Sequence, residues 1–176
     1  MKKFQPLIQY KRSNIIEKLH LGCVCAINSD KKIILNFGNI KTQSFLFRSA
    51  QKPFQCYNLL KNNIYKKFGL TDKSLAIFSG SHTGTAAHID LLKEILNKTG
   101  IKQENIKCPK SYPLDEKTKT KMLINNEAPT NLHNNCSGKH LAMLINCKEN
   151  DWNFSDYLNP NHPLQQEIFF NHKTLL

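Results

Sequence analysis

Three short polar segments constrain this chain more than any other feature of its sequence. Residues 48–55, 79–85 and 131–140 each lie between a short apolar run and a helix-forming stretch. Backbone N–H groups at the start of a helix lack intrahelical partners and are free to bind an anion or oxyanion. One such segment would be an ordinary capped helix start. Because all three carry serine, cysteine, histidine or lysine side chains, we expect them to meet in one active site.

The first polar segment contains the spacing Ser49-x-x-Lys52. The apolar run 44–47 leads into it, and a helix is expected to begin near Ser49 and to end near residues 61–63. On one helix the two side chains lie about one turn apart on the same face, with the lysine amine within reach of the hydroxyl. A base beside a hydroxyl activates a nucleophile that is otherwise too weak to attack. Acyl-transferring serine enzymes use the same spacing.

The remaining pattern predicts one domain that mixes strands and helices, of the α/β (α+β) class. Two apolar runs separated by the turn residues Asn28-Ser29-Asp30-Lys31 predict an antiparallel hairpin. Gly100 is a helix stop and Asp115 is a helix cap. The expected strands are 21–27, 32–38 and 42–47. The expected helices are 86–98, 115–124, 141–145 and one opened by the proline-punctuated segment 156–168, and 74–78 is a short apolar element.

Length and cysteine pattern narrow the class of protein further. A chain of 176 residues can bury a core of its own. It has no run near the ~18 apolar residues that a transmembrane helix needs. The N-terminus carries basic residues without a continuous apolar core, so we expect no signal peptide, no membrane association and a cytoplasmic location. Its six cysteines form no C-x-x-C pair, which favours free thiols over a disulfide framework.

The net charge of +12 raises the question of nucleic-acid binding. The basic residues are nearly all lysines scattered along the chain, and Arg12 and Arg48 are the only arginines. Arginine is the residue preferred for bidentate contacts to bases and phosphates. We therefore expect no nucleic-acid partner.

Four motifs together resemble the L-asparaginase II family, the asparaginases with a serine-β-lactamase-like fold. They are residues 48–55, Ser81-His82-Thr83-Gly84, residues 133–140, and Tyr157-Leu158-Asn159-Pro160 followed by residues 162–165. They occur in the family's order, and the resemblance covers about residues 20–168. It implies a serine-β-lactamase-like sheet with flanking helices and the hydrolysis of L-asparagine to L-aspartate and ammonia.

The resemblance also implies roles for individual residues. One of these roles makes Lys139 a zinc ligand. A lysine ligand to zinc is unusual, and the amine would have to be neutral, with a strongly lowered pKa. The implied roles are Ser49 as the nucleophile, Lys52 as its base, Ser81 as a second active-site serine, Arg48, His82 and His140 at the substrate, and Cys136 and Lys139 as zinc ligands.

Two departures from the family pattern affect these expectations. Thr85 replaces a glutamate, and the resemblance ends near Ile168 although family members are considerably longer. We therefore expect residues 1–168 to be the N-terminal half of one asparaginase-like domain, truncated after about half its length, and residues 169–176 to be an unrelated or divergent tail. The third zinc ligand and a second lysine beside Ser81 would lie in the missing half.

A truncated domain has physical consequences. It would leave an unpaired sheet edge and exposed apolar surface, low zinc affinity, and weak or absent activity alone. A homodimer or a complementary C-terminal fragment would be its partner. Two other classes stay open: a penicillin-binding-protein-like serine acylase that keeps Ser49 and Lys52, and an inactive basic binding or scaffold protein.

Overall fold

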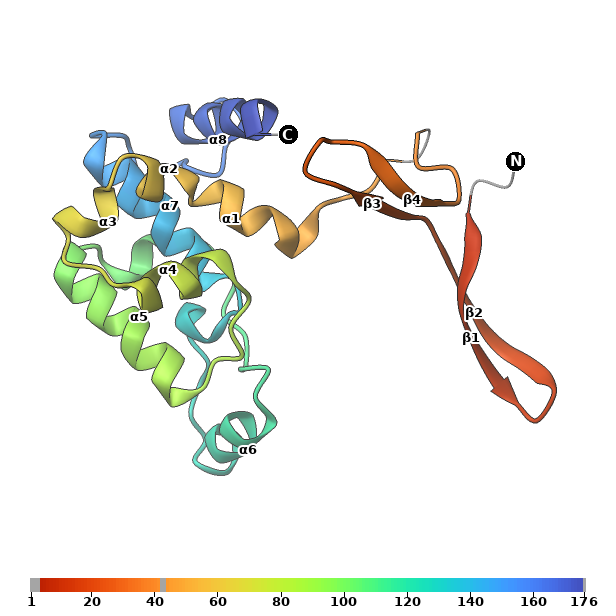
Figure 1. Ribbon diagram of the computed structural model, residues 1–176. Coiled ribbons are helices and arrows are strands. Elements are labelled where there is room, and N and C mark those ends of the chain that lie inside the picture. Colours follow the sequence, from red (N-terminus) through yellow and green to blue (C-terminus); the bar gives the residue numbers. More distant parts are fainter. Residues whose placement is uncertain (1–3, 42–43, 176) are drawn as a thin grey trace. The chain divides into compact units, whose positions relative to one another are not determined.

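The computed structural model describes residues 4–41 and 44–175 (Figure 1). The chain divides into two compact units, Met1–Leu46 and Phe47–Leu176. Strands occupy the first and helices the second, so the expected mixture of helix and strand is confirmed.

None of the helices in the described part of the chain is long and apolar enough to cross a membrane. In chain order the elements are β1 (Gln5–Arg12), β2 (Ile15–Gly22), β3 (Val24–Ile27), β4 (Ile33–Phe37), η1 (Arg48–Gln51), α1 (Lys52–Gln55), α2 (Tyr57–Lys61), α3 (Ile64–Lys67), α4 (Asp72–Ser79), α5 (Ala86–Thr99), η2 (Gln103–Asn105), α6 (Glu116–Ile124), η3 (Asn131–His133), α7 (Ser137–Glu149) and α8 (Pro163–Leu175).

The predicted hairpin is present as the antiparallel pair β3–β4, in which Val24 faces Phe37. Its turn is held by Asn28, whose Oδ1 accepts the backbone N–H of Asp30 at 3.1 Å and of Lys32 at 2.9 Å. An asparagine side chain that bonds to the backbone two residues on is a common way to fix a turn. Strand β3 is shorter than expected because the chain up to Gly22 belongs to β2.

A second antiparallel hairpin, β1–β2, was missed by the sequence analysis. Its register shifts between Pro6 and Ile8 and again between Tyr10 and Lys11. Such irregularities interrupt the two-residue alternation by which a strand is recognised. Its turn begins at Ser13, a non-glycine residue with a φ of 51°.

The strand unit buries little of its own apolar surface. Among its described residues only Gly22 is buried, and thirteen large apolar side chains of β1–β4 are exposed. The described strands form two sheets of two strands each, and an isolated two-stranded hairpin is marginally stable in water. The larger serine-β-lactamase-like sheet stays a prediction.

The strand expected at 42–47 is wrong for residues 44–47, which form no strand; residues 42 and 43 lie outside the described part. Phe47 already has helical angles, φ −59° and ψ −28°. Arg48 then adopts a φ of 50°, the left-handed conformation that non-glycine residues rarely take. This residue directs the chain into the 3₁₀ turn η1.

Helix α7 forms the centre of the helical unit and packs against α1, α2, α4, α5 and α8 (Figure 1). Leu141, Leu144 and Ile145 on α7 are completely buried. Truncating a buried leucine or isoleucine to alanine typically costs about 2–5 kcal/mol. The apolar stretch 141–145 was predicted to be helical, and the helix extends beyond it in both directions.

The boundaries of α5 and α6 follow the predicted signals. Helix α5 ends at Gly100, which has a φ of 65°. Helix α6 is capped by Asp115, whose Oδ2 accepts the Thr118 N–H at 2.9 Å. Thr85 caps α5 together with His88.

Two predicted elements differ in the structure. The single helix expected after Ser49 is divided into η1, α1 and α2, and the break falls at Cys56, whose φ of −106° and ψ of 6° interrupt the helix. The apolar residues 74–78 lie inside α4, a helix that begins with a capping box at Thr71. Because five apolar or small residues can satisfy either period, short apolar runs do not distinguish helix from strand.

Helix α8 runs through residues that were expected to be an unrelated tail. Leu164 and Ile168 face the core, and Asn171 is buried as well. The Asn171 amide Nδ2 donates to Asn58 Oδ1 at 2.6 Å, which joins α8 to α2. Residues up to Asn171 therefore take part in the packing of the helical unit.

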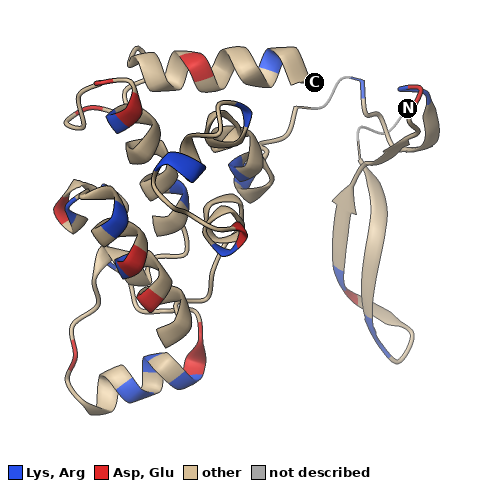
Figure 2. Ribbon diagram, turned by 60° about the vertical axis from the view of Figure 1, so that its left-hand side comes forward, with Lys and Arg blue, Asp and Glu red and all other residues tan. Residues whose placement is uncertain are grey.

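Charge is distributed widely over the elements. Figure 2 shows lysine and arginine on both units, with acidic residues among them in each. This distribution agrees with the scattered basic residues of the sequence.

Candidate active site

The first polar segment places Ser49 and Lys52 on adjacent elements. Ser49 lies in η1 and is exposed, whereas Lys52 is the first residue of α1 and is only 2% exposed. Pro53 follows at a position in the first helical turn, where its missing N–H costs no hydrogen bond. The local sequence thus turns the lysine side chain inward and leaves the serine at the surface.

The buried Lys52 amine lies within hydrogen-bond distance of three oxygen atoms. Its Nζ lies 3.0 Å from the Gly80 carbonyl oxygen, 3.1 Å from the Asn135 carbonyl oxygen and 2.7 Å from Ser81 Oγ. These partners come from the second and third polar segments. Contacts of the lysine therefore join all three segments, as expected.

Ser81 connects the lysine to Ser49. The two serine Oγ atoms lie 3.0 Å apart, and Ser81 is the residue that also contacts Lys52 Nζ. Helical spacing predicted a direct contact between the Lys52 amine and the Ser49 hydroxyl. In the structure the two groups are connected through the Ser81 hydroxyl. The reason is that η1 and α1 do not form one regular helix, so the one-turn relationship fails.

A glycine allows these segments to approach. A Cβ built on Gly138, in the first turn of α7, would lie 2.1 Å from the Ile77 carbonyl oxygen of α4. No other residue type has room there. The contact places Asn135, just before α7, beside Gly80, just after α4, and both carbonyls then reach Lys52.

A small pocket of about 280 Å³ opens beside Ser49. Its lining combines three cationic side chains with two primary amides, a hydroxyl and a thiol, and it is called the Ser49 pocket below. It is lined by Arg48, Ser49, Gln51, Lys52, Gln55, Cys136 and Lys139.

Burial lowers the pKa of Lys52 from its ordinary value. Cys136 opposes this shift through its charge and a hydrogen bond, and the charge of Lys139 adds to it. A lysine with a lowered pKa holds more of its neutral, basic form near neutral pH. The amine beside Ser81 is therefore suited to accept a proton.

A comparison with known protein families identifies the family of this chain. The model of the family described as L-asparaginase II matches residues 8–176. The chain belongs to the L-asparaginase II family. The match includes residues 169–176, and a comparison with curated proteins found no match.

Two histidines of the L-asparaginase II motifs have partners outside the Ser49 pocket. His82 Nε2 lies 2.7 Å from Ser137 Oγ, and His140 Nδ1 lies 2.7 Å from the Tyr157 hydroxyl. Burial lowers the pKa of each to about 4, so both are neutral at pH 7. Neither is among the residues that line the Ser49 pocket. Their expected contact with substrate stays a prediction.

His82 instead lines a second pocket, of about 660 Å³, together with Ser81. The Ser137 hydroxyl donates to the Leu132 carbonyl oxygen at 3.1 Å, so it accepts from His82 Nε2–H. A hydrogen bond with the Asn134 backbone partly opposes the effect of burial on the His82 pKa. The second pocket is larger, but Ser49 does not line it.

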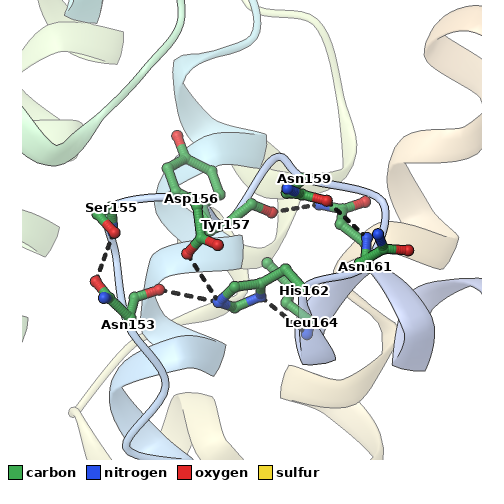
Figure 3. Close-up of polar contacts among 9 residues, drawn as sticks. Asn153, Ser155, Asp156, Tyr157, Asn159, Asn161, His162 and Leu164 are labelled. Atoms are coloured by element: carbon green, nitrogen blue, oxygen red, sulfur yellow. Dashed lines mark hydrogen bonds and ion pairs between the residues drawn. The ribbon is translucent and has the colours of Figure 1, made fainter.

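The fourth motif has a structural role in this fold (Figure 3). His162 Nε2 donates to the Asn153 carbonyl oxygen at 3.0 Å, and its Nδ1 accepts the Leu164 N–H at 3.1 Å. The Tyr157 hydroxyl accepts the Lys107 N–H at 2.9 Å and contacts His140. The motif thus fixes the turn before α8, and its Tyr157 hydroxyl holds the His140 ring in place.

Two of the expected zinc donors, Cys136 and Lys139, line the same pocket. Within residues 4–41 and 44–175 no three histidine, cysteine, aspartate or glutamate side chains are grouped to hold a metal ion. Zinc in structural and catalytic sites takes at least three protein ligands. Cys136 and Lys139 are two expected donors, and zinc binding by them stays a prediction.

Sequence reasoning missed four contributors to the site. Gln51 and Gln55 line the Ser49 pocket, and the carbonyls of Gly80 and Asn135 hold the lysine. The spacing of Gln51 and Gln55, one turn apart beside Ser49, was a usable signal. Carbonyl partners carry no signal in the sequence, because every residue has one.

Proposed function

We propose that this chain carries an asparaginase-type amidohydrolase site that converts L-asparagine and water to L-aspartate and ammonia. Ser49 is the nucleophile, and Ser81 passes its proton to Lys52. The observation that supports this most strongly is the connected series Ser49 Oγ, Ser81 Oγ and Lys52 Nζ, with separations of 3.0 and 2.7 Å.

The two carbonyl partners of Lys52 determine how the relay is oriented. A neutral amine has two N–H donors and one lone pair, and the carbonyls of Gly80 and Asn135 can only accept. They take the two N–H groups, so the lone pair faces Ser81. The charged lysine donates to Ser81, and Ser81 donates to Ser49. With a neutral lysine both hydrogen bonds reverse, so that Ser81 donates to Lys52 and accepts from Ser49, which activates the Ser49 hydroxyl.

Acylation and deacylation use this relay in both directions. Ser49 Oγ attacks the side-chain amide carbon of the substrate, and its proton moves through Ser81 to Lys52. The protonated lysine returns a proton through Ser81 to the leaving nitrogen, and ammonia departs from the tetrahedral intermediate, which leaves an ester on Ser49. Water then attacks the ester, gives its proton to the relay, and the proton returns to Ser49 as aspartate leaves.

Arg48 supports the choice of a substrate that carries a carboxylate, because it lines the Ser49 pocket and arginine binds carboxylates in a bidentate manner. We also propose that Cys136 and Lys139 bind zinc with low affinity, and no step of the reaction depends on the metal. The serine-β-lactamase-like sheet is likewise part of the proposal.

One observation favours a chain that is weakly active by itself. The strand unit exposes most of its apolar side chains, including Ile15 at 72% and Ile34 at 68%. Such surface favours association with a second copy or with a complementary C-terminal fragment. Activity that rises with protein concentration or on adding such a fragment is the expected sign.

The deciding experiment measures ammonia release from L-asparagine by purified protein over a range of protein concentrations. Replacing Ser49 by alanine is expected to lower turnover by at least about 10³-fold, since loss of a nucleophile removes the covalent route. Ser155→Ala removes an exposed hydroxyl elsewhere and serves as the matched control. Turnover that survives Ser49→Ala would show that another group is the nucleophile.

A further inference from the structure

A second pocket adjoins the Ser49 pocket at Gln51. It lies along α8, the helix that packs against α1 and α7 (Figure 1). It is formed by Gln51 and by residues between Leu158 and His172, and it is called the α8 pocket below. Its volume of about 490 Å³ falls within the roughly 300–1,000 Å³ that is usual for ligand sites. Gln51, the last residue of η1, lines both pockets, so the two spaces are neighbours.

The α8 pocket differs in charge from the Ser49 pocket. Among the described residues its lining contains no lysine, arginine, aspartate or glutamate, whereas three cationic side chains line the Ser49 pocket. Its apolar wall includes Phe169, which is 58% exposed and therefore has ring surface left to bury. Lys173 Nζ lies 4.6 Å from the centroid of that ring and would repel a cationic ligand. The pocket thus favours an uncharged, apolar group. The apolar wall consists of Leu158, Pro160, Ile168 and Phe169.

The polar part of the α8 pocket is held in place by its own contacts. The side-chain amides of Gln165 and Gln166 donate to carbonyl oxygens of the loop before α8, at 2.7 and 2.6 Å. The His172 ring packs edge-on against two phenylalanine rings, with centroid separations of 4.8 and 4.9 Å. A ligand group that enters the pocket therefore meets walls that are already ordered, which lowers the entropy cost of binding.

The position of Gln51 determines which end of a substrate can extend into the α8 pocket. In the proposed reaction the carboxylate binds at Arg48, which lines the Ser49 pocket but not the α8 pocket. The amide carbon lies at Ser49, and the amide nitrogen is the opposite end of the molecule from the carboxylate. A group attached to that nitrogen therefore extends past Gln51 and departs with the amine during acylation.

We propose that the chain also hydrolyses L-asparagine derivatives whose amide nitrogen carries an uncharged apolar group, and that this group lies in the α8 pocket. This inference rests on the proposed amidohydrolase function, and L-asparagine itself remains a substrate that leaves the α8 pocket unfilled. Ser49 Oγ forms the ester as the amide C–N bond breaks, and the amine leaves with the proton returned through Ser81. Water then hydrolyses the ester to L-aspartate.

The test compares the β-benzylamide and the β-methylamide of L-aspartate as substrates of the full chain, with release of L-aspartate as the measurement. We expect kcat/KM to favour the benzylamide by about tenfold, the effect of burying part of an aromatic ring. Phe169→Ser should narrow this ratio because it removes part of the apolar wall. Phe170→Ser is the matched control, since Phe170 is 66% exposed on the same helix and does not line the pocket. The intrinsic reactivities of the two amides are the same in every variant, so a changed ratio reports the pocket.

A binding measurement separates this inference from the proposed function. Titration calorimetry on Ser49→Ala compares the affinities of the two amides without turnover, and tighter binding of the benzylamide supports the inference. L-asparagine hydrolysed while the two amides are bound equally, or a ratio that Phe169→Ser leaves unchanged, would overturn the inference and leave the proposed function standing. Folded protein that hydrolyses neither L-asparagine nor either amide would overturn the proposed function.

Discussion

Lys52 Nζ lies 2.7 Å from Ser81 Oγ, although 29 residues separate the two in sequence. The same hydroxyl lies 3.0 Å from Ser49 Oγ. Ser49 is the serine nearer to Lys52 in sequence, but it contacts the lysine only through Ser81. This order distinguishes a relay through Ser81 from a simple pair of Ser49 and Lys52, and it can be tested by mutation.

Ser81→Ala should lower kcat for amide hydrolysis by about 10²–10³-fold, because removing the middle hydroxyl disconnects the nucleophile from its base. Acylation should still occur on Ser49, which mass spectrometry of the trapped ester locates. Ser79→Ala is the control, because its hydroxyl donates to the Leu75 carbonyl oxygen of its own helix. An ester found on Ser81 in the wild-type chain would reverse the roles of the two serines.

Lys52→Arg should abolish measurable turnover even though the positive charge is kept, because a guanidinium does not release a proton to become a base. In the wild-type chain, kcat should rise with pH as Lys52 loses its proton. The midpoint should fall below the ordinary lysine value of 10.5, because burial lowers this pKa. Lys61→Arg controls for substitution of a surface lysine. A rate independent of pH up to 10.5 would contradict a lysine base.

His82 and His140 should make the helical unit sensitive to acid. Their pKa values are lowered from 6.5 to about 4 by burial, so the unfolded chain binds more protons between those values. The stability they contribute is complete above pH 6.5 and is lost progressively as the pH falls from 6.5 to about 4. Lowering the pH from 7.5 to 5 should reduce the free energy of unfolding by about 2 kcal/mol for each histidine.

Urea unfolding followed by circular dichroism at several pH values measures this effect. His140→Gln should reduce the slope of unfolding free energy against pH, because glutamine does not titrate. His20→Gln replaces an exposed histidine of the strand unit and should leave the slope unchanged. Equal slopes in the wild-type chain and in His140→Gln would show that His140 is not responsible.

Gly138→Ala should destabilise the helical unit by about 3 kcal/mol or more, because the added Cβ would lie 2.1 Å from the Ile77 carbonyl oxygen. Gly69→Ala is the comparison, since its φ of 61° is strained for alanine but nothing lies within 4 Å of the new Cβ. That change should cost about 1 kcal/mol. Unfolding midpoints in urea compare the two, and equal losses would mean that α4 and α7 can separate freely.

The sequence predicted the local elements with clear end signals, and it predicted the gathering of the three polar segments. Asp115, Gly100 and Asn28 each bond or bend in the way their residue types require. The order of the relay was beyond its reach, because it depends on the 3₁₀ turn at Ser49 and on the left-handed Arg48. Neither conformation has a signal in a run such as Phe47-Arg48-Ser49.

Gly138 shows a second kind of limit. A glycine in the first turn of a helix lowers helix propensity by up to about 1 kcal/mol, which suggests a close contact without naming its partner. Only the packing of α7 on α4 shows that the partner is the Ile77 carbonyl. The strand unit is the reverse case: its apolar residues predict a buried sheet, and the described residues leave them exposed.

Two of the groups that hold the Lys52 amine are main-chain carbonyls, those of Gly80 and Asn135. Main-chain atoms are supplied by any amino acid that follows the same backbone path. Position 135 should therefore accept many side chains in a saturation library without moving the amine, whereas positions 52 and 81 should accept almost none. The backbone path therefore sets the position of this amine. Residues that contact the same nitrogen atom should differ sharply in their tolerance to mutation, according to whether they contact it through main chain or side chain.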